Sequence, residues 1–170
     1  MEPNFYPTTT DKIARYEQFL KEFALFIERE TEEISILANT TAALREAFDW
    51  FWIGFYIVHG EELILGPFQG NTACFRIRKG RGVCGTAWAK ACTQIVPDVE
   101  QFPGHIACNS LSRSEIVVPV WQDNKICAVL DVDSDQLNTF DEIDRLYLEQ
   151  LCQLISQTLY RNKTKCKEIL

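Results

Sequence analysis

The chain has 170 residues, of which 46% are apolar and 24% are charged, a composition typical of one folded domain and not of a disordered segment. Its 24 acidic residues outnumber its 17 basic ones, and the net charge of −7 argues against nucleic-acid binding, which needs a basic face, and against binding to anionic membranes. No apolar run approaches the ~20 residues of a membrane span, and residues 1–12 lack the features of a secretory signal. We therefore expect a cytoplasmic protein without nucleic-acid or membrane partners.

The first part of the chain predicts two helices. Residues 8–11 are typical of a helix start, and apolar side chains recur at helical spacing from Ile13 to Phe26. A second helix is expected over residues 34–48. We assign residues 1–30 to an N-terminal helical segment and residues 31–161 to the core of a single domain with its C-terminal helix.

Strands dominate the middle of the chain. In the apolar stretch 50–58, Trp52 and Tyr56 share one face of a predicted strand, while Ile53 and Phe55 point to the other. We expect, in order, a turn at 59–62, a return strand at 63–65, an extended segment at 74–78, a helix over 83–91, a short strand at 94–97 and an irregular segment at 98–113.

Two further apolar strands, 115–121 and 125–133, form a predicted hairpin around a turn at 122–124. Residues 139–142 fit a capping box, and an apolar face continues at helical spacing to about Arg161, before a polar tail at 162–170. Helices at both ends of a hairpin-rich centre predict an α+β domain, in which a central antiparallel sheet is flanked by N- and C-terminal helices.

Seven cysteines without a secretory signal are unlike a disulfide scaffold, so some of them are candidates for chemistry. Cys152 falls on the apolar side of the last helix and Cys127 alternates with Val129 on a strand, which predicts packing roles for both. Cys166 in the polar tail is expected to have no role, and Cys92 at the end of a short helix is left open.

Cys74, Cys84 and Cys108 are different because they lie in glycine-bearing loops or at a predicted helix start. A helix N-terminus favours a thiolate at Cys84 and offers free N–H groups to an anion. A redox or nucleophilic role and a structural role both stay open on these grounds. A zinc site made by His105, Cys108, Cys84 and Cys74 is the alternative, but the irregular spacing and the lack of a C-x-x-C pair argue against it.

Three acidic residues are candidates for a pocket. Asp131 and Asp133 share one face of a strand, where their repulsion raises at least one pKa, although a solvated strand end would explain them equally. Glu115 opens the neighbouring strand. If the three converge, they form a small anionic pocket suited to an ammonium group. Trp52 and Tyr56 either pack in the core or form an aromatic wall of that pocket.

Five segments, taken in order, resemble a known family: residues 80–87 (GRGVCGTA), 96–99 (VPDV), 102–108 (FPGHIAC), 114–119 (SEIVVP) and 130–134 (LDVDS). In sequence and spacing this run is similar to the free methionine-(R)-sulfoxide reductases, which are single GAF domains. The resemblance extends from about Ile34 to the last helix. It departs from many family members at Asn109, where they carry Asp.

The resemblance implies roles for individual residues. Cys108 matches the nucleophile, and Cys74 and Cys84 match two further cysteines, one or both of which resolve the intermediate. The acids that hold the substrate match Glu115, Asp131 and Asp133, and the pocket aromatics match Trp52 and Tyr56. The other four cysteines match nothing in the motifs.

The implied reaction begins when the Cys108 thiolate attacks the sulfoxide sulfur of the free amino acid and becomes a sulfenic acid. Backbone N–H groups of Gly82, Val83 and Cys84 would stabilise the oxygen, and a neutral pocket acid would give the proton. A disulfide then forms, and thioredoxin, itself reduced by NADPH through thioredoxin reductase, restores the thiols. No metal or bound organic cofactor is implied, and a homodimer through the terminal helices is possible in such domains.

Two other functions fit parts of the sequence. A GAF sensor that binds a small ligand such as a cyclic nucleotide would need neither the three cysteines nor the acids. A thiol-based peroxide sensor would need the cysteines but not the acids or the aromatic residues.

Overall fold

The computed structural model describes residues 3–106, 108 and 110–165, so Ala107, Asn109 and Cys166 lie outside the described residues. The elements in order are α1 (Lys12–Ile27), α2 (Glu33–Phe48), β1 (Trp52–His59), β2 (Glu62–Gln69), β3 (Arg76–Arg78), α3 (Gly82–Lys90), β4 (Gln94–Val96), the 3₁₀ turn η1 (Val99–Gln101), β5 (Ser114–Gln122), β6 (Lys125–Ser134) and α4 (Glu142–Lys165). The six strands form one antiparallel sheet in the order β3-β2-β1-β6-β5-β4. This confirms the predicted α+β class.

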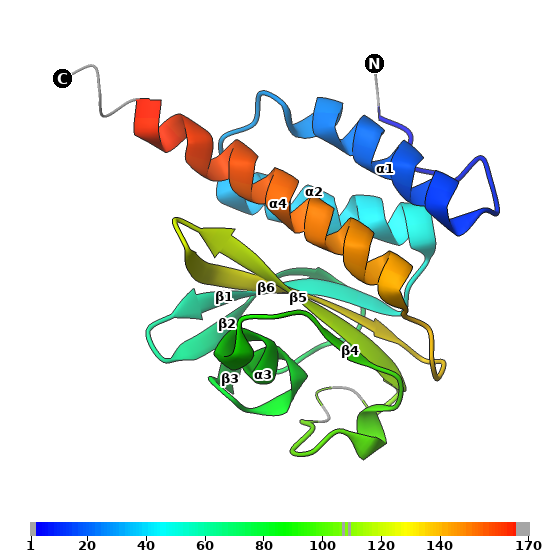
Figure 1. The fold of residues 1–170 in the computed structure, drawn as a ribbon, viewed down its shortest axis with the longest axis vertical. Coiled ribbons are helices and arrows are strands. Elements are labelled where there is room, and N and C mark those ends of the chain that lie inside the picture. Colours follow the sequence, from blue (N-terminus) through cyan, green and yellow to red (C-terminus); the bar gives the residue numbers. More distant parts are fainter. Residues whose placement is uncertain (1–2, 107, 109, 166–170) are drawn as a thin grey trace.

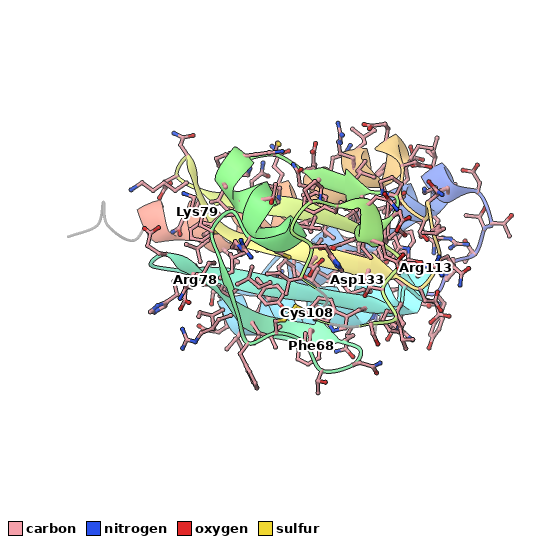
Figure 2. The ribbon with its side chains drawn as sticks, turned by 90° about the horizontal axis from the view of Figure 1, so that it is seen from below. Phe68, Arg78, Lys79, Cys108, Arg113 and Asp133 are labelled. Carbon is pink, nitrogen blue, oxygen red and sulfur yellow. A yellow bond between two sulfur atoms is a disulfide. The ribbon has the colours of Figure 1, made fainter. Side chains whose placement is uncertain are left out.

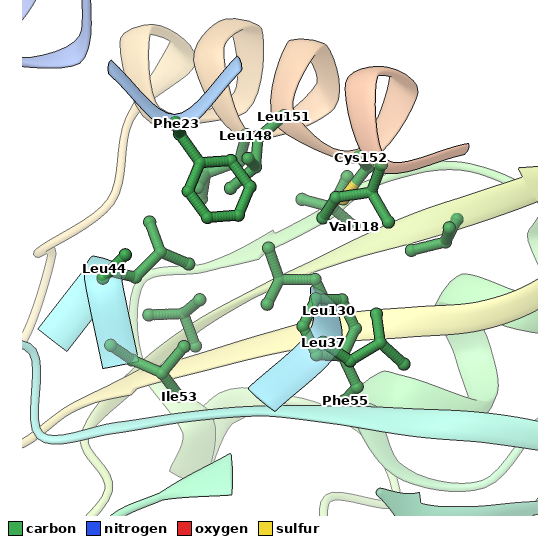
Figure 3. Close-up of a cluster of buried hydrophobic side chains, with 14 of the residues drawn as sticks. Phe23, Leu37, Leu44, Ile53, Phe55, Val118, Leu130, Leu148, Leu151 and Cys152 are labelled. Atoms are coloured by element: carbon green, nitrogen blue, oxygen red, sulfur yellow. The ribbon is translucent and has the colours of Figure 1, made fainter. Parts of the chain in front are cut away.

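The sheet separates two layers (Figure 1). Helices α1, α2 and α4 lie together over one face, and α3 with its neighbouring loops lies over the other. The helical layer buries the main core, in which Phe23, Leu44, Phe55 and Leu148 are fully buried (Figure 3). Cys152 is buried in the same cluster, so its predicted packing role is confirmed. Within the described residues, no helix has the length and apolar character that a membrane span requires.

The opposite face of the sheet carries a second, smaller cluster. Trp52 and Tyr56 belong to it, whereas Ile53 and Phe55 belong to the main core, as the alternation in β1 predicts. Here the strands β1, β5 and β6 face α3 and the loop that follows η1. Any site on this side therefore has the central strands as its floor.

The helix starts are held by side chains. Asp11 accepts a hydrogen bond from the Ala14 N–H at 2.8 Å, as predicted for the start of α1. The predicted capping box at 139–142 is wrong by two residues. Asp141 accepts from the N–H groups of the first turn of α4, and Asp144 accepts from the Asp141 N–H at 2.7 Å. Helix α4 also extends to Lys165, beyond the predicted end near Arg161.

Two bulges shift the strands from simple alternation. Strand β2 continues past the predicted end at Leu65, because Gly66 and Pro67 sit in a bulge opposite Phe55 before pairing resumes at Phe68. A second register shift lies near the β5–β6 turn. It turns Cys127 toward the main core, so the expectation that Cys127 shares the face of Val129 and the acids is wrong.

Candidate active site

A cavity lies between the central strands, the start of α3 and four residues of the following loop, His105, Ile106, Cys108 and Ser112. It is small, with about 40 Å³ of accessible space, and it is partly open to solvent. Its lining residues are Trp52, Tyr56, Ala73, Ile77, Gly82, Val83, Cys84, His105, Ile106, Cys108, Ser112, Glu115, Asp131 and Asp133. Every site residue expected from the sequence lines this cavity except Cys74, which is bonded to one that does.

The three candidate acids converge on the cavity floor. Glu115 on β5 is the register partner of Asp133 on β6, and Asp131 lies two residues along the same face. Glu115 and Asp131 are buried, at 6% and 7% exposure, so they are not a solvated strand end. Salt bridges within the described residues involve none of the three. The fold therefore brings three carboxyl groups together without a salt-bridge partner in the described part of the chain.

Burial changes how these acids titrate. It raises the pKa of Asp131 to about 6 and the pKa of Glu115 well above its usual range, where the charges of Asp131 and Asp133 add to the effect. The pKa of Asp133 is also raised by burial and by Asp131, while a hydrogen bond from Ser112 opposes the rise. The hydrogen bond between the two carboxyls raises the pKa of Glu115 and opposes the rise for Asp131, so a shared proton is favoured on Glu115. The cluster thus pairs a carboxyl that favours its proton with one that ionises more easily.

Cys84 belongs to this cluster and not to a thiolate site. Its side chain is buried, and its thiol donates a hydrogen bond to Asp131. Burial raises the pKa of the thiol well above its usual range, and the charges of Asp131 and Glu115 raise it further. The expectation that the helix start favours a Cys84 thiolate is therefore wrong, because burial beside two acids outweighs the helix dipole.

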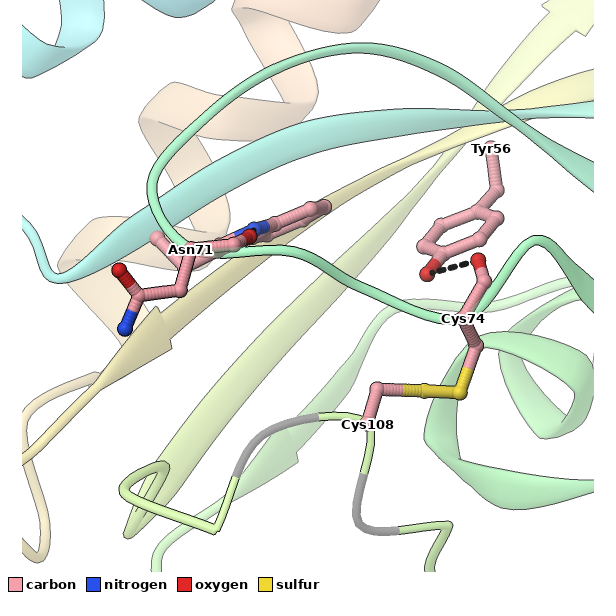
Figure 4. The surroundings of a disulfide bond; sticks show 5 residues. Tyr56, Asn71, Cys74 and Cys108 are labelled. Atoms are coloured by element: carbon pink, nitrogen blue, oxygen red, sulfur yellow. Dashed lines mark hydrogen bonds between the residues drawn. A yellow bond between two sulfur atoms is a disulfide. The ribbon is translucent and has the colours of Figure 1, made fainter.

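Cys74 and Cys108 are joined by a disulfide with a Cα–Cα distance of 5.3 Å (Figure 4). Both are half-buried, and they link the segment before β3 to the loop after η1. Because two of the four proposed zinc ligands are bonded to each other, the His105–Cys108–Cys84–Cys74 metal set is absent from this state. From the sequence, Cys84 and Cys74 are equal candidates for the bond to Cys108. In the structure Cys84 is a free, buried thiol that is hydrogen-bonded to Asp131.

The two aromatic residues hold the segment that carries Cys74. Trp52 donates a hydrogen bond from Nε1 to the Asn71 carbonyl at 2.9 Å, and Tyr56 donates from its hydroxyl to the Cys74 carbonyl at 3.0 Å (Figure 4). The Trp52 ring lies so close to Gly54 and Gly70 that a Cβ at either would come within 2.5 Å of it or nearer. The Trp52 and Tyr56 side chains therefore both line the cavity and hold the segment that carries Cys74.

The start of α3 presents backbone donors to the cavity. Gly82, Val83 and Cys84 line it, and no described side chain caps this helix. The Gly85 N–H is already taken by the Arg81 carbonyl at 3.0 Å, so the predicted donors are the first three residues only. Gly82 has a φ of +59°, which favours glycine there.

One set of side chains has metal-ligand chemistry: the Cys84 sulfur and the carboxyl oxygens of Glu115 and Asp131 lie within 4.8 Å of one another. All three are protonated more readily than usual, and metal ligands must be deprotonated. The chemistry of this set therefore suits proton donation better than metal binding.

Sequence reasoning assigned no site role to Ser112 or Ile106. Ser112 hydrogen-bonds Asp133, and Ile106 lies 3.3 Å from where a Cβ of Gly82 would be. Both come from the irregular segment 98–113, where periodicity carries no signal. The one signal for a site role was their position in the sequence: Ile106 lies within the GHIAC segment and Ser112 shortly before the SEIVVP segment.

Comparisons with known proteins agree with this geometry. Residues 30–159 match the GAF domain family. A GAF domain-containing protein A from Dictyostelium discoideum is 59% identical over 85% of this chain and 92% of its own length. A free methionine-R-sulfoxide reductase from Escherichia coli is 43% identical over 88% of this chain and 91% of its own. This chain belongs to the GAF-domain family of free methionine-R-sulfoxide reductases.

A solved structure supports the same assignment. The free methionine-R-sulfoxide reductase from Neisseria meningitidis, in complex with its substrate, is 49% identical to this chain and superposes with a TM-score of 0.90, covering 92% of this chain and 95% of that one. The family and the GAF fold predicted from the five segments are thereby confirmed. The roles of individual residues stay predictions.

Proposed function

We propose that this chain reduces free methionine-(R)-sulfoxide to methionine, with Cys108 as the attacking thiol. One observation carries the proposal: a disulfide-forming cysteine lines the same cavity as three acids that have no basic partner among the described residues. The relatives named above support this choice of substrate.

The chemical step needs a proton as much as a nucleophile, because a sulfoxide is a poor electrophile until its oxygen is protonated. The Cys108 thiolate attacks the sulfur, the oxygen receives a proton, and methionine leaves while Cys108 retains the oxygen as a sulfenic acid. Glu115 is suited to give the proton because burial and its two acidic neighbours raise its pKa and favour its protonated form. The N–H groups of residues 82–84 would stabilise charge that develops on the oxygen.

The acids also fit the free amino acid form of the substrate. An ammonium group beside Asp131 or Asp133 would compensate their buried charge. One oxygen of Asp131, Oδ1, is buried without a hydrogen-bond partner among the described residues and is available to such a group. Trp52 and Tyr56 would contact the apolar part of the substrate.

Recycling uses Cys74 in this proposal. Its thiol attacks the Cys108 sulfenic acid, water leaves, and the Cys74–Cys108 disulfide forms, so that two thiols have supplied the two electrons. The Cα–Cα distance of 5.3 Å is ordinary for a disulfide, whereas Cys84 is buried with its thiol bonded to Asp131. A dithiol protein of the thioredoxin class then restores both thiols, and no bound cofactor is used.

The test is methionine release from the free R-sulfoxide by the parent enzyme and three serine variants. Cys108→Ser should lose essentially all turnover, because a hydroxyl is a far weaker nucleophile than a thiol. Cys74→Ser should release about one methionine per enzyme and then fail to recycle with thioredoxin. Cys84→Ser should recycle.

Cys152→Ala serves as the control, since its side chain packs in the main core away from the cavity. It should lower stability with little change in turnover. Substantial reduction of the sulfoxide by Cys108→Ser would refute the proposal. Recycling by Cys74→Ser at the parent rate would remove Cys74 from its role.

A further inference from the structure

The disulfide lies beside an unusually exposed aromatic residue. Phe75 follows Cys74 directly and is 81% exposed, the highest value of any large apolar side chain in the described part of the chain. An exposed aromatic ring has no packing reason to be there, and aromatic residues dominate the energetics of protein contacts. Its neighbour in the chain is a cysteine whose disulfide another protein has to reach.

Basic side chains follow Phe75 in an otherwise acidic protein. Arg76 pairs with Glu62 at 3.1 Å, while Arg78 and Arg81 form no salt bridge with any described residue. Lys79 lies over the Trp88 ring at 4.8 Å. Figure 2 shows Arg78 and Lys79 on the side of the molecule that carries Cys108. Arg78 is also the register partner of Glu62, and Arg78 and Lys79 share a hollow with Glu61, so this edge of the sheet carries charges of both signs.

The two sulfurs face different surroundings. Cys108 lines the substrate cavity, and Cys74 does not. Tyr56 fixes the Cys74 carbonyl by a 3.0 Å hydrogen bond, so the position of Phe75 beside the disulfide is set by the sheet. Cys74 is therefore the sulfur of the pair that lies outside the cavity lining, next to the exposed Phe75.

Resting on the proposed function, we propose that Phe75 is the contact for the dithiol protein that reduces the Cys74–Cys108 disulfide, and that this partner attacks Cys74. The partner's thiol should lie in an apolar surface that accommodates the Phe75 ring.

The exchange balances as follows. The partner thiolate attacks the Cys74 sulfur, the Cys74–Cys108 bond breaks, and Cys108 leaves as a thiolate inside the cavity, ready for the next sulfoxide. The second thiol of the partner then loses its proton and attacks the partner's first sulfur, which is bonded to Cys74 in the mixed disulfide. Cys74 leaves and takes up a proton. The partner ends as a disulfide, and two electrons have passed to this chain.

The experiment compares two reductants on Phe75→Ser: thioredoxin with its reductase and NADPH, and dithiothreitol, which needs no docking surface. With thioredoxin we expect kcat/KM for the reductant to fall about 10-fold or more, as for a contact hot spot. Turnover with dithiothreitol should match the parent. Ile34→Ser is the matched control, because Ile34 is 74% exposed on α2, away from the cavity.

A trapping experiment tests the site of attack. Thioredoxin in which the second active-site cysteine is replaced by serine should form a mixed disulfide that peptide mapping assigns to Cys74, and Phe75→Ser should slow its formation. Equal thioredoxin kinetics for parent and Phe75→Ser, or a mixed disulfide at Cys108, would overturn the proposal. Loss of turnover by the parent with dithiothreitol would instead count against the proposed function.

Discussion

The carboxyl of Asp131 is held between two groups that donate to it. The Cys84 thiol and the Glu115 carboxyl both hydrogen-bond to it, while its Oδ1 has no partner among the described residues. Its pKa rises from 3.8 to about 6 because the ion is buried, so ionising it in the fold costs about 3 kcal/mol. The folded protein binds this proton more tightly than the unfolded chain does. Stability is therefore lost as the pH rises through about 6.

We predict that Asp131→Asn stabilises the substrate-free protein at pH 8 by up to about 3 kcal/mol and has little effect near pH 3, where the carboxyl is mostly neutral in both states. The same variant should lose most of its affinity for the sulfoxide. Urea unfolding at the two pH values, with the disulfide intact, measures the first effect. Asp135→Asn is the control, because Asp135 is exposed and close by. A variant that is equally destabilised at both pH values would show that the hydrogen bonds from Cys84 and Glu115 stabilise the fold by more than the buried charge destabilises it.

At the scale of elements, α3 depends on one close approach. A Cβ at Gly85 would come within 2.4 Å of the Arg78 carbonyl, and the Gly80 N–H donates to the Gly85 carbonyl at 2.8 Å. Alanine is favoured over glycine inside a helix by about 1 kcal/mol. Here the clash is with backbone, which cannot rotate away, so it outweighs the gain.

We predict that Gly85→Ala lowers the free energy of unfolding by about 1–3 kcal/mol and also lowers kcat/KM, because it moves the start of α3 against the cavity. Ala89→Gly is the matched control on the exposed side of the same helix. It should cost about 1 kcal/mol in stability with normal kinetics for the sulfoxide. Parent kinetics in Gly85→Ala would mean that the position of α3 does not matter for the reaction.

The elements that the sequence predicted well are those with a strong period. The buried face of α1 follows from the helical spacing of its apolar residues, and that of β1 from strand alternation. The β5–β6 hairpin was predicted from its turn, where Asp123 and Asn124 take positive φ values. Errors arose where local signals competed. Gly66 and Pro67 read as a strand end but form a bulge, and another bulge turned Cys127 to the opposite face.

The candidate site also has some features that the sequence predicts and others that it does not. That Asp131 and Asp133 share a face followed from the two-residue period of a strand. Their convergence with Glu115 was only a condition in the sequence, and the register of β5 against β6 meets it. That Cys84 is a buried neutral thiol while Cys74 reaches Cys108 depends on how α3 and the loops pack on the sheet. Residue type and spacing carry no such information, because a helix start and a loop look equally accessible in sequence.

At the scale of the whole molecule, the cavity is closed on three sides. The sheet is its floor, α3 and the loop residues His105, Ile106, Cys108 and Ser112 form its sides, and the Cys74–Cys108 disulfide ties the segment before β3 to that loop. In such a space a peptide would need a path for the chain on both sides of the sulfoxide, which a free amino acid does not need. The acids add a charge requirement to this steric one.

We therefore predict activity on the free R epimer of methionine sulfoxide, and little on the S epimer or on N-acetylated or peptide-bound R-sulfoxide. A blocked substrate lacks the ammonium, so an ionised carboxyl stays buried and unpaired, which costs about 2–5 kcal/mol for each lost charge pair. This corresponds to roughly 30-fold or more in affinity before any steric clash is counted. Initial rates on the four substrates, at matched concentrations with excess dithiothreitol, make the measurement. Comparable rates on the free and the N-acetylated R-sulfoxide would show that Asp131 and Asp133 do not hold an ammonium, and the acids would then keep only their proton-donating role.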